Sequence, residues 1–425
     1  MTAVSGLSLE RESHAQHDIR MSWHPRCTDI DSTAWKRLFR APTLGLFWFK
    51  ALEAGTGQQF KFWYGQIRSG VATVGIVPAF LFDLPLEIIL PQRERKVLHR
   101  LARGPLRRTR YVRTFFVGNV AGEEGTVGLD EDLEREEVYP FIHDAARKKA
   151  NELGASLLVW KDFPGGDAMV LDGLIRARSV SRVPSYPGTV IPVLETGYAA
   201  FLAGQKASRR HKIRRKLSVG EATVPVCTRV VVHPDATELS TLFELFQQTY
   251  ARGTTKFESL TPGFFHEIAA AEESTFIVLS DQSTGKPVAF MLLLDLGSRI
   301  INQFVGIDYS RGNQAFLPFR LFAKAYDWAA QRGASTLCSG QTGYAAKLDL
   351  GHQLVPLWNY CHHANQVMNW VLSRVASRIR VESLDDQLRI HFEGAHAIDT
   401  KSANPFLKPS TCSSLSGNPA RRRHL

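Results

Sequence analysis

A repeated pattern of helix, glycine and strand limits the folds open to this chain more than any other feature of its sequence. In the first half, an apolar helical stripe ends at Gly154-Ala155-Ser156 and passes directly into a short apolar stretch. In the second half, a similar stripe ends at Gly333-Ala334-Ser335 and again passes into an apolar stretch. A glycine after an amphipathic helix is typical of a helix cap, and the apolar run after it is typical of a buried strand. The sequence therefore predicts one helix-and-strand unit that occurs twice.

The segments before these two helices also match. A strand-turn-strand pattern is predicted in each half, at residues 62–67 with 71–80 and at residues 275–279 with 287–294. Ahead of the second pattern, helices are predicted at 237–251, behind Asp235, and at 262–271, behind Thr261. The order in both halves is strand, two helices, hairpin, further strand, helix and strand. We therefore expect a mixed α/β protein of two tandem units, each with a mixed central sheet flanked by helices; the alternative is chance recurrence of Gly-Ala-Ser.

Length and composition agree with two units and set their expected limits. The chain has 425 residues, of which 44% are hydrophobic and 10% aromatic, so disorder is excluded for most of it. We expect a disordered N-terminus (residues 1–20), a first unit (21–195), a second unit that holds the active site (196–385) and a disordered basic tail (398–425). The formal charge of +11 favours anionic partners, such as nucleic acid, phosphorylated carriers or lipid head groups, without choosing among them.

The sequence also indicates a compartment. Its five cysteines form no CxxC pair, which favours a reducing environment over a disulfide framework. The first 20 residues lack the apolar core of a signal peptide. The most apolar long stretch, residues 71–90, is interrupted by Asp83, Glu87 and two prolines, which argues against a membrane helix. We expect a soluble enzyme in the cytoplasm or at the inner face of the membrane.

The second half carries a family resemblance. A predicted strand at 299–308 and helix at 316–332 are followed by Gly340-Gln341, by Tyr344 and Lys347 before Leu-Asp-Leu-Gly, and by an apolar strand with Pro-Leu. This succession resembles the GNAT acyltransferase superfamily and, more narrowly, its tandem branch of FemAB-like and peptidoglycan-biosynthesis-type acetyltransferases. The basic run 208–216 is similar to the one that leads into the second unit of FemAB-like proteins. The resemblance spans residues 31–378.

The resemblance implies an N-acyltransferase that moves an acyl group from a thioester donor to an amine. The expected co-substrate is an acyl-CoA or an acyl carrier protein, with no tightly bound cofactor and no metal. Members that bind acetyl-CoA carry a glycine pattern before this helix, whereas residues 310–318 here contain Gly312 alone. The alternatives are therefore a FemAB-type transferase that uses charged tRNA in cell-envelope precursor synthesis, and a non-catalytic protein that binds nucleic acid or anionic lipid.

Three residues are candidates for the chemistry. Gln303, with Asn302 beside it, could polarise a carbonyl, and Asp308 at the end of the same strand could accept a proton. The resemblance gives Tyr344 the role of general acid toward a leaving thiol. The competing interpretations are a carboxylate in a strand-end turn for Asp308 and a packed core residue for Tyr344.

Other residues are candidates for binding. The start of the 316–332 helix suits a phosphate, and the expected ligands of the co-substrate are Arg311, Gly312, Asn313, Gln314 and Lys347. The expected contacts of an anionic substrate or acceptor are Arg209, Arg210, Lys212, Lys256 and Glu258. An ordinary helix start, a charged linker helix and a solvated loop are the competing interpretations. A second basic cluster at 93–113 is predicted to be an inserted hairpin that faces membrane or nucleic acid.

A metal site is not predicted at Cys361-His362-His363, although His352 lies nearby in the sequence. Adjacent residues of a strand point to opposite faces, and no second cluster stands at ligand spacing. We expect a buried cysteine beside surface histidines.

Overall fold

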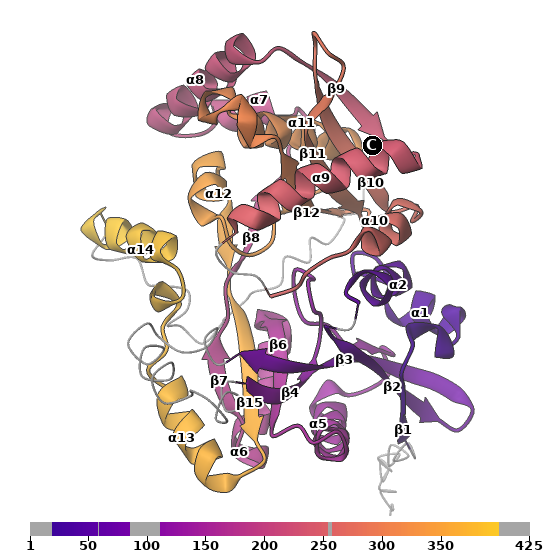
Figure 1. Cartoon of the computed structure of the whole chain (residues 1–425). Coiled ribbons are helices and arrows are strands. Elements are labelled where there is room, and N and C mark those ends of the chain that lie inside the picture. Colours follow the sequence, from indigo (N-terminus) through magenta and orange to yellow (C-terminus); the bar gives the residue numbers. More distant parts are fainter. Residues whose placement is uncertain (1–18, 58, 86–110, 254–256, 399–425) are drawn as a thin grey trace, which may run out of the picture.

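The structure, a computed structural model, describes residues 19–57, 59–85, 111–253 and 257–398 and contains two β-sheets with helices around them (Figure 1). Most of the two segments predicted to be disordered, 1–20 and 398–425, lies outside the described residues, but Ile19 and Arg20 belong to a strand and Ile398 ends a helix. Lys256 and the basic cluster as far as Arg110 also lie outside the described residues.

The first sheet is built mainly from the first half of the chain. Its strands from that half are β1 (Ile19–His24), β2 (Lys61–Ser69), β3 (Ala72–Pro85), β4 (Tyr111–Val117), β5 (Gly128–Leu129), β6 (Leu157–Pro164) and β7 (Ser181–Pro184). Its helices are α1 (Ser32–Leu38), α2 (Leu46–Gly55), α5 (Arg135–Glu152) and α6 (Gly165–Arg178), with a short 3-10 turn η1 (Cys27–Asp29). The strand order is β1-β2-β3-β4-β6-β15-β7, in which β15 is Leu357–His363, and β5 pairs with β3. Among the described strands of this sheet, β4 and β6 alone pair in parallel.

The second sheet repeats this plan. Its strands are β8 (Gly188–Pro192), β9 (Val226–Val231), β10 (Ser274–Asp281), β11 (Pro287–Asp295), β12 (Arg299–Ile307), β13 (Thr336–Cys338) and β14 (Gln353–Val355). The accompanying helices are α7 (Tyr198–Ala203), α8 (Ala207–Thr223), α9 (Ala236–Arg252), α10 (Pro262–Ala269), α11 (Leu317–Gln331) and α12 (Tyr344–Leu350), with 3-10 turns η3 (Tyr309–Arg311) and η4 (Asn313–Ala315). The order is β9-β10-β11-β12-β13-β8-β14, and β12 and β13 are its parallel pair.

The tandem mixed α/β fold predicted from the repeat is confirmed. Both hairpins form, and their turns contain Gly70 and Gly285 at φ 58° and 70°, values that glycine adopts without strain. Asp235 caps α9, because its carboxylate accepts from Glu238 N at 2.8 Å. Pro262 occupies the first turn of α10, where no N–H partner is needed.

The two sheets exchange one strand each. β15 (Leu357–His363) comes from the second half, yet it lies between β6 and β7 of the first sheet and is antiparallel to both. β8 comes from the first half and lies between β13 and β14 of the second sheet. The chain then ends its described part with α13 (Gln366–Ala376), the turn η5 (Val381–Ser383) and α14 (Asp386–Ile398). The division of domains at residue 195 stays a prediction, and the exchange crosses it in both directions.

The two units also share a core. α2 of the first unit packs on α10 of the second, where Trp48 and Phe264 meet edge to face at 5.6 Å and both are fully buried. A Cβ atom at Gly55 would lie 2.0 Å from Phe264 Cβ, so only glycine permits this approach. Because apolar surface is buried across this contact, the units hold a fixed relation and residues of both can contribute to one site.

Candidate functional site

Two parallel strands separate near the middle of the second sheet. β12 pairs with β11 along nearly its whole length, but with β13 only through residues 299–301 and 336–338. Past this point β13 ends, and the chain turns at Gly340 with φ 63°. The carboxyl ends of parallel strands are a common place for ligands, because the sheet no longer occupies the space between them. The first residues beyond the last pair are Asn302, Gln303 and Ser339.

A chain of hydrogen bonds crosses this opening. His352 Nδ1 lies 3.0 Å from Lys347 O, and because a carbonyl only accepts, Nδ1 carries the proton. His352 Nε2 therefore accepts from Ser339 Oγ at 3.0 Å. Ser339 Oγ in turn accepts from Asn302 Nδ2 at 3.4 Å. Burial and the charge of Lys347 lower the pKa of His352 to about 3, so the imidazole is neutral at pH 7 and Ser339 faces an unprotonated nitrogen.

Lys347 lies beside this chain. Its ammonium donates to Gly340 O and Gln341 O, each at 3.1 Å, which leaves one of its three protons for another partner. Burial lowers the pKa of Lys347, and the nearby Glu123 offsets part of that decrease. An amine with a lowered pKa can give up or take a proton near neutral pH.

Acidic residues from the first unit reach the same place. Glu123 is almost completely buried, and burial raises its pKa although Arg299 and Lys347 oppose the change. Its neighbour Glu124 accepts from Arg299 Nη1 at 2.6 Å. A small pocket beside them is lined by residues of the 42–44 loop, the 119–126 segment, and Arg299 and Ile301 of β12. The opening is therefore polar and is built from both units.

Three buried polar atoms in the opening have no hydrogen-bond partner among the described residues: Asn302 Oδ1, Gln303 Oε1 and Gln341 Nε2. The orientation of the Gln303 amide is fixed, because its Nε2 donates to Ala121 O at 2.8 Å. A buried polar group without a partner costs roughly 1–3 kcal/mol, so three of them on residues that border the strand separation favour a bound molecule that supplies partners.

Comparison with known proteins identifies the domain that holds this opening. Residues 207–347 match the family model of an acetyltransferase (GNAT) domain. The second unit is therefore a GNAT-type domain. No curated protein matches the chain by sequence.

Solved structures extend the likeness to most of the chain. The crystal structure of FemX is 12% identical, with a TM-score of 0.53, over 83% of this chain and 100% of that one. A conserved protein of unknown function from Bacteroides thetaiotaomicron is 13% identical, with a TM-score of 0.50, over 80% and 99% of the two chains. A tandem GNAT protein from the clavulanic acid biosynthesis pathway is 12% identical over 81% and 99%, with a TM-score of 0.47. Together with the repeated strand order, the likeness to FemX shows that this chain shares the fold of that protein.

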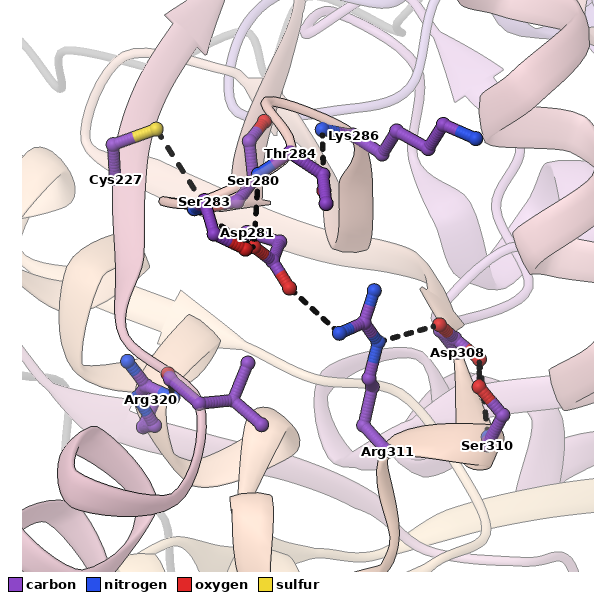
Figure 2. Close-up of polar contacts among 11 residues, drawn as sticks. Cys227, Ser280, Asp281, Ser283, Thr284, Lys286, Asp308, Ser310, Arg311 and Arg320 are labelled. Atoms are coloured by element: carbon purple, nitrogen blue, oxygen red, sulfur yellow. Dashed lines mark hydrogen bonds and ion pairs between the residues drawn. The ribbon is translucent and has the colours of Figure 1, made fainter.

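Two of the residues predicted for the site, Gln303 and Lys347, lie at the opening of the GNAT domain. Asp308 lies at the far end of β12, where its carboxylate accepts from Ser310 N at 3.0 Å, from Ser310 Oγ at 2.6 Å and from Arg311 Nε at 3.1 Å (Figure 2). Burial alone would raise the pKa of Asp308, but these hydrogen bonds outweigh it and the pKa is lowered. Whether Asp308 accepts a proton in a reaction stays a prediction, and its lowered pKa makes it a weak base.

Arg311, predicted to contact a phosphate, already has two carboxylate partners. Figure 2 shows its guanidinium between Asp308 and Asp281, whose Oδ2 lies 2.6 Å from Arg311 Nη1. Hydrogen bonds from Ser283 and Thr284, together with Arg311, lower the pKa of Asp281 to about 2, so it is charged. Next to Arg311, the N–H groups of Gly312, Ala315 and Phe316 donate within 3-10 turns. A phosphate at Gly312, Asn313 and Gln314 stays a prediction and would meet a neutralised arginine.

Tyr344 begins α12 and is buried. Its ring packs with Val381, Leu388 and Phe392, and its hydroxyl donates to Pro187 O at 2.9 Å. Burial raises the pKa of Tyr344. Its role as an acid stays a prediction, and it would require the hydroxyl to leave Pro187.

The basic run lies on α8, which packs against α11 and α12 of the GNAT domain. Arg209 donates to Gln205 Oε1 at 2.7 Å, and Arg210 donates to Ala203 O and Gln205 O at 3.0 and 3.1 Å. Lys212 pairs with Asp349 of α12 at 2.7 Å. These three predicted anion contacts therefore already have partners within the protein, whereas Arg214 and Arg215 are exposed.

Glu258 is half-buried, and burial raises its pKa to about 7 although the charge of Lys161 opposes the change.

Sequence reasoning missed Glu123 and Ser339 and considered His352 only as a metal ligand. No local pattern marks these three residues, because strand separation and the packing of the units bring them together.

Within the described part of the chain, no group of three or more His, Cys, Asp or Glu is placed to hold a metal ion. Nor does any helix there have the length and apolarity to cross a membrane.

Proposed function

We propose that the chain is an N-acyltransferase whose reaction takes place at the opening between β12 and β13. One observation carries the proposal: three buried polar atoms without partners belong to residues that border this opening, as do Lys347 and Glu123, whose pKa values burial moves toward neutrality. Transfer of an acyl group to an amine needs hydrogen-bond partners for a carbonyl and an amine, and a path for one proton. The opening offers each of these.

The residues can be assigned roles in one balanced step. The amine nitrogen attacks the carbonyl carbon of the donor, a C–N bond forms, and the C–S bond to the thiol breaks. Gln303 Oε1 holds the amine, and Gln341 Nε2 and Lys347 Nζ stabilise the negative carbonyl oxygen. The carboxylate of Glu123 takes the proton that the amine loses, and Lys347 gives one to the leaving thiolate. Ser339 and His352 are positioning residues that fix Asn302 and the backbone of Lys347.

Charged tRNA is the second candidate donor. The carboxylate partners of Arg311 and the single Gly312 favour it, since the place where GNAT proteins hold the CoA pyrophosphate carries no free arginine. α8 packs against the helix that bears Lys347 and exposes Arg214 and Arg215, which suits a phosphate backbone. In this case the acceptor would be the amine of a cell-envelope precursor, and Lys347 would protonate the leaving ribose oxygen.

A donor screen tests the proposal. The purified protein is incubated with acetyl-CoA, longer acyl-CoAs, acyl carrier protein or aminoacyl-tRNA and a panel of amines, and products are followed by mass spectrometry alongside thermal shifts. We expect a new amide from at least one donor. Turnover with aminoacyl-tRNA alone selects the second candidate. Binding of nucleic acid or lipid without any amide product would contradict both and leave a binding protein.

Variants locate the site once a donor is known. Lys347→Met should lower kcat by roughly 100-fold or more, because general acid and electrostatic contributions are both lost. Gln303→Leu should mainly raise KM for the amine. Lys324→Met, at an exposed position of α11, is the matched control and should leave both constants unchanged.

Tyr344→Phe decides the sequence-based prediction: a tenfold loss of kcat supports an acid role, and unchanged kcat with lower stability supports a structural one.

A further inference from the structure

α13 directs most of its apolar side chains away from the protein. The outward residues include Val367 and Trp370, which are 69% and 57% exposed, and also Met368, Val371 and Val375. The residues that it buries are Asn369 and Ala376. A helix packed on a protein core ordinarily has the reverse arrangement, with its apolar stripe inside. The exposed face of α13 is therefore not explained by packing within the described part of the chain.

A polar side chain holds α13 in place. Asn369 Oδ1 accepts from His363 N at 2.9 Å, and Asn369 Nδ2 donates to Ser179 O at 2.7 Å. These bonds fasten the helix to the edge of the first sheet, where Figure 1 shows it beside β7 and β15. Because the attachment is polar, the apolar residues of α13 remain available for another surface.

Trp370 distinguishes this face from a chance group of valines. The chain has eight tryptophans, all in described segments. Trp370 is exposed, whereas the other seven are buried or half-buried. The guanidinium of Arg374 lies over its ring at 4.7 Å. Tryptophan is enriched at membrane–water interfaces, where its ring meets acyl chains and its N–H meets head groups.

The charged residues of this segment have one sign. Residues 366–380 contain Arg374, Arg378 and Arg380 and no Asp or Glu, while acidic residues resume at Glu382. Arginines beside exposed valines, methionine and tryptophan are typical of helices that lie in the interface of an anionic bilayer. A nucleic acid would use the arginines but would leave Val367 and Met368 in water.

We propose that α13, with residues 377–380, docks the protein on the surface of an anionic lipid bilayer. Trp370, Met368 and the valines enter the interfacial layer, and the arginines contact lipid phosphates. This inference goes beyond the proposed function and uses none of the residues of the opening, so either can fail alone.

Vesicle binding by the full chain tests the proposal. Wild-type protein is sedimented with vesicles of phosphatidylcholine alone and of phosphatidylcholine and phosphatidylglycerol in equal parts, and tryptophan emission is recorded. We expect binding to the anionic vesicles with a blue shift that Trp370→Phe reduces while binding persists. Met368→Ser with Trp370→Ser should lower the partition coefficient by roughly tenfold or more. Arg378→Gln with Arg380→Gln should lower it by roughly thirtyfold at low salt.

Controls separate this face from other basic parts of the chain, because the segment 93–110 and Arg421–Arg423 could also attract anions. Val232→Ser, at an exposed position next to β9, should leave binding unchanged. The proposal is overturned if wild type does not bind anionic vesicles, or if binding falls with salt but not in the Met368→Ser, Trp370→Ser variant. It is equally overturned if the wild-type chain is a dimer and the Met368→Ser, Trp370→Ser variant is a monomer, since α13 would then be a dimer interface.

Discussion

At the scale of single residues, burial decides which ionisable groups can take part in chemistry. Lys347 and Gln303 could be named from the sequence, because a lysine before Leu-Asp-Leu-Gly and an amide on a strand are visible in one dimension. Glu123, Ser339 and His352 could not, since each comes from a different element and their altered environment exists only after folding. Arginine commonly binds phosphate, but the guanidinium of Arg311 is already paired with the carboxylates of Asp281 and Asp308.

Glu258 gives a prediction about pH at this scale. Its folded pKa of about 7 lies above the ordinary 4.5, so the neutral form is favoured by folding. The stabilisation is fully present below pH 4.5 and is lost as pH rises through 7. Glu258→Gln stays neutral, so the excess of its melting temperature over that of wild type should grow as pH rises from 4.5 to about 7.

Thermal melts over this pH range provide the measurement. Glu244→Gln, at an exposed position of α9, serves as the control and should show no such trend. A difference between Glu258→Gln and wild type that does not change with pH would contradict the raised pKa.

At the scale of elements, α8 shows what a sequence pattern leaves open. Its basic residues predicted a helix, and the structure has one from Ala207 to Thr223. The sequence did not indicate which side packs, because charges surround the helix. The structure buries Ile213 and Gly220, which lie two turns apart on one face. The docking of α8 therefore depends on one small residue as well as on its charges.

Gly220→Ala tests this contact. A Cβ atom there would lie 2.6 Å from Ala315 O and 2.9 Å from Arg320 Cδ, so the helix must shift and stability should fall by roughly 1–3 kcal/mol. Gly173→Ala is the matched control within α6, since no atom lies within 4 Å of the added Cβ; it should stabilise by roughly 0.5–1 kcal/mol. Urea denaturation measures both. Equal effects of the two substitutions would show that α8 does not pack through Gly220.

At the scale of the whole molecule, strand exchange joins the two units. Tyr360 belongs to the second half of the sequence, yet it is fully buried in the first sheet, where its hydroxyl donates to Asp172 Oδ1 at 2.7 Å. Neither sheet is complete without a strand from the other half of the chain. We therefore expect one cooperative unfolding transition rather than two.

Tyr360→Ala tests this coupling. The lost packing should destabilise the protein by roughly 3–5 kcal/mol. Calorimetry should show a single transition at lower temperature, and hydrogen exchange should increase in β11 and β12 as well as in β4 and β6. Val71→Ala, at a fully exposed turn position, should change neither. Two separate transitions, with only the first sheet affected, would show that the units unfold independently.

The sequence by itself determined the repeated unit, the helices and hairpins and their order, because hydrophobic periodicity and capping residues are local properties. Tertiary structure alone decided the strand exchange, since pairing at a sheet edge depends on which strands arrive there and not on the pattern within each strand. It also decided the polar opening, because β12 and β13 separate there and Glu123 approaches from the other unit. Side chains as far apart along the chain as Glu123 and His352, which are 229 residues from each other, thereby border one opening.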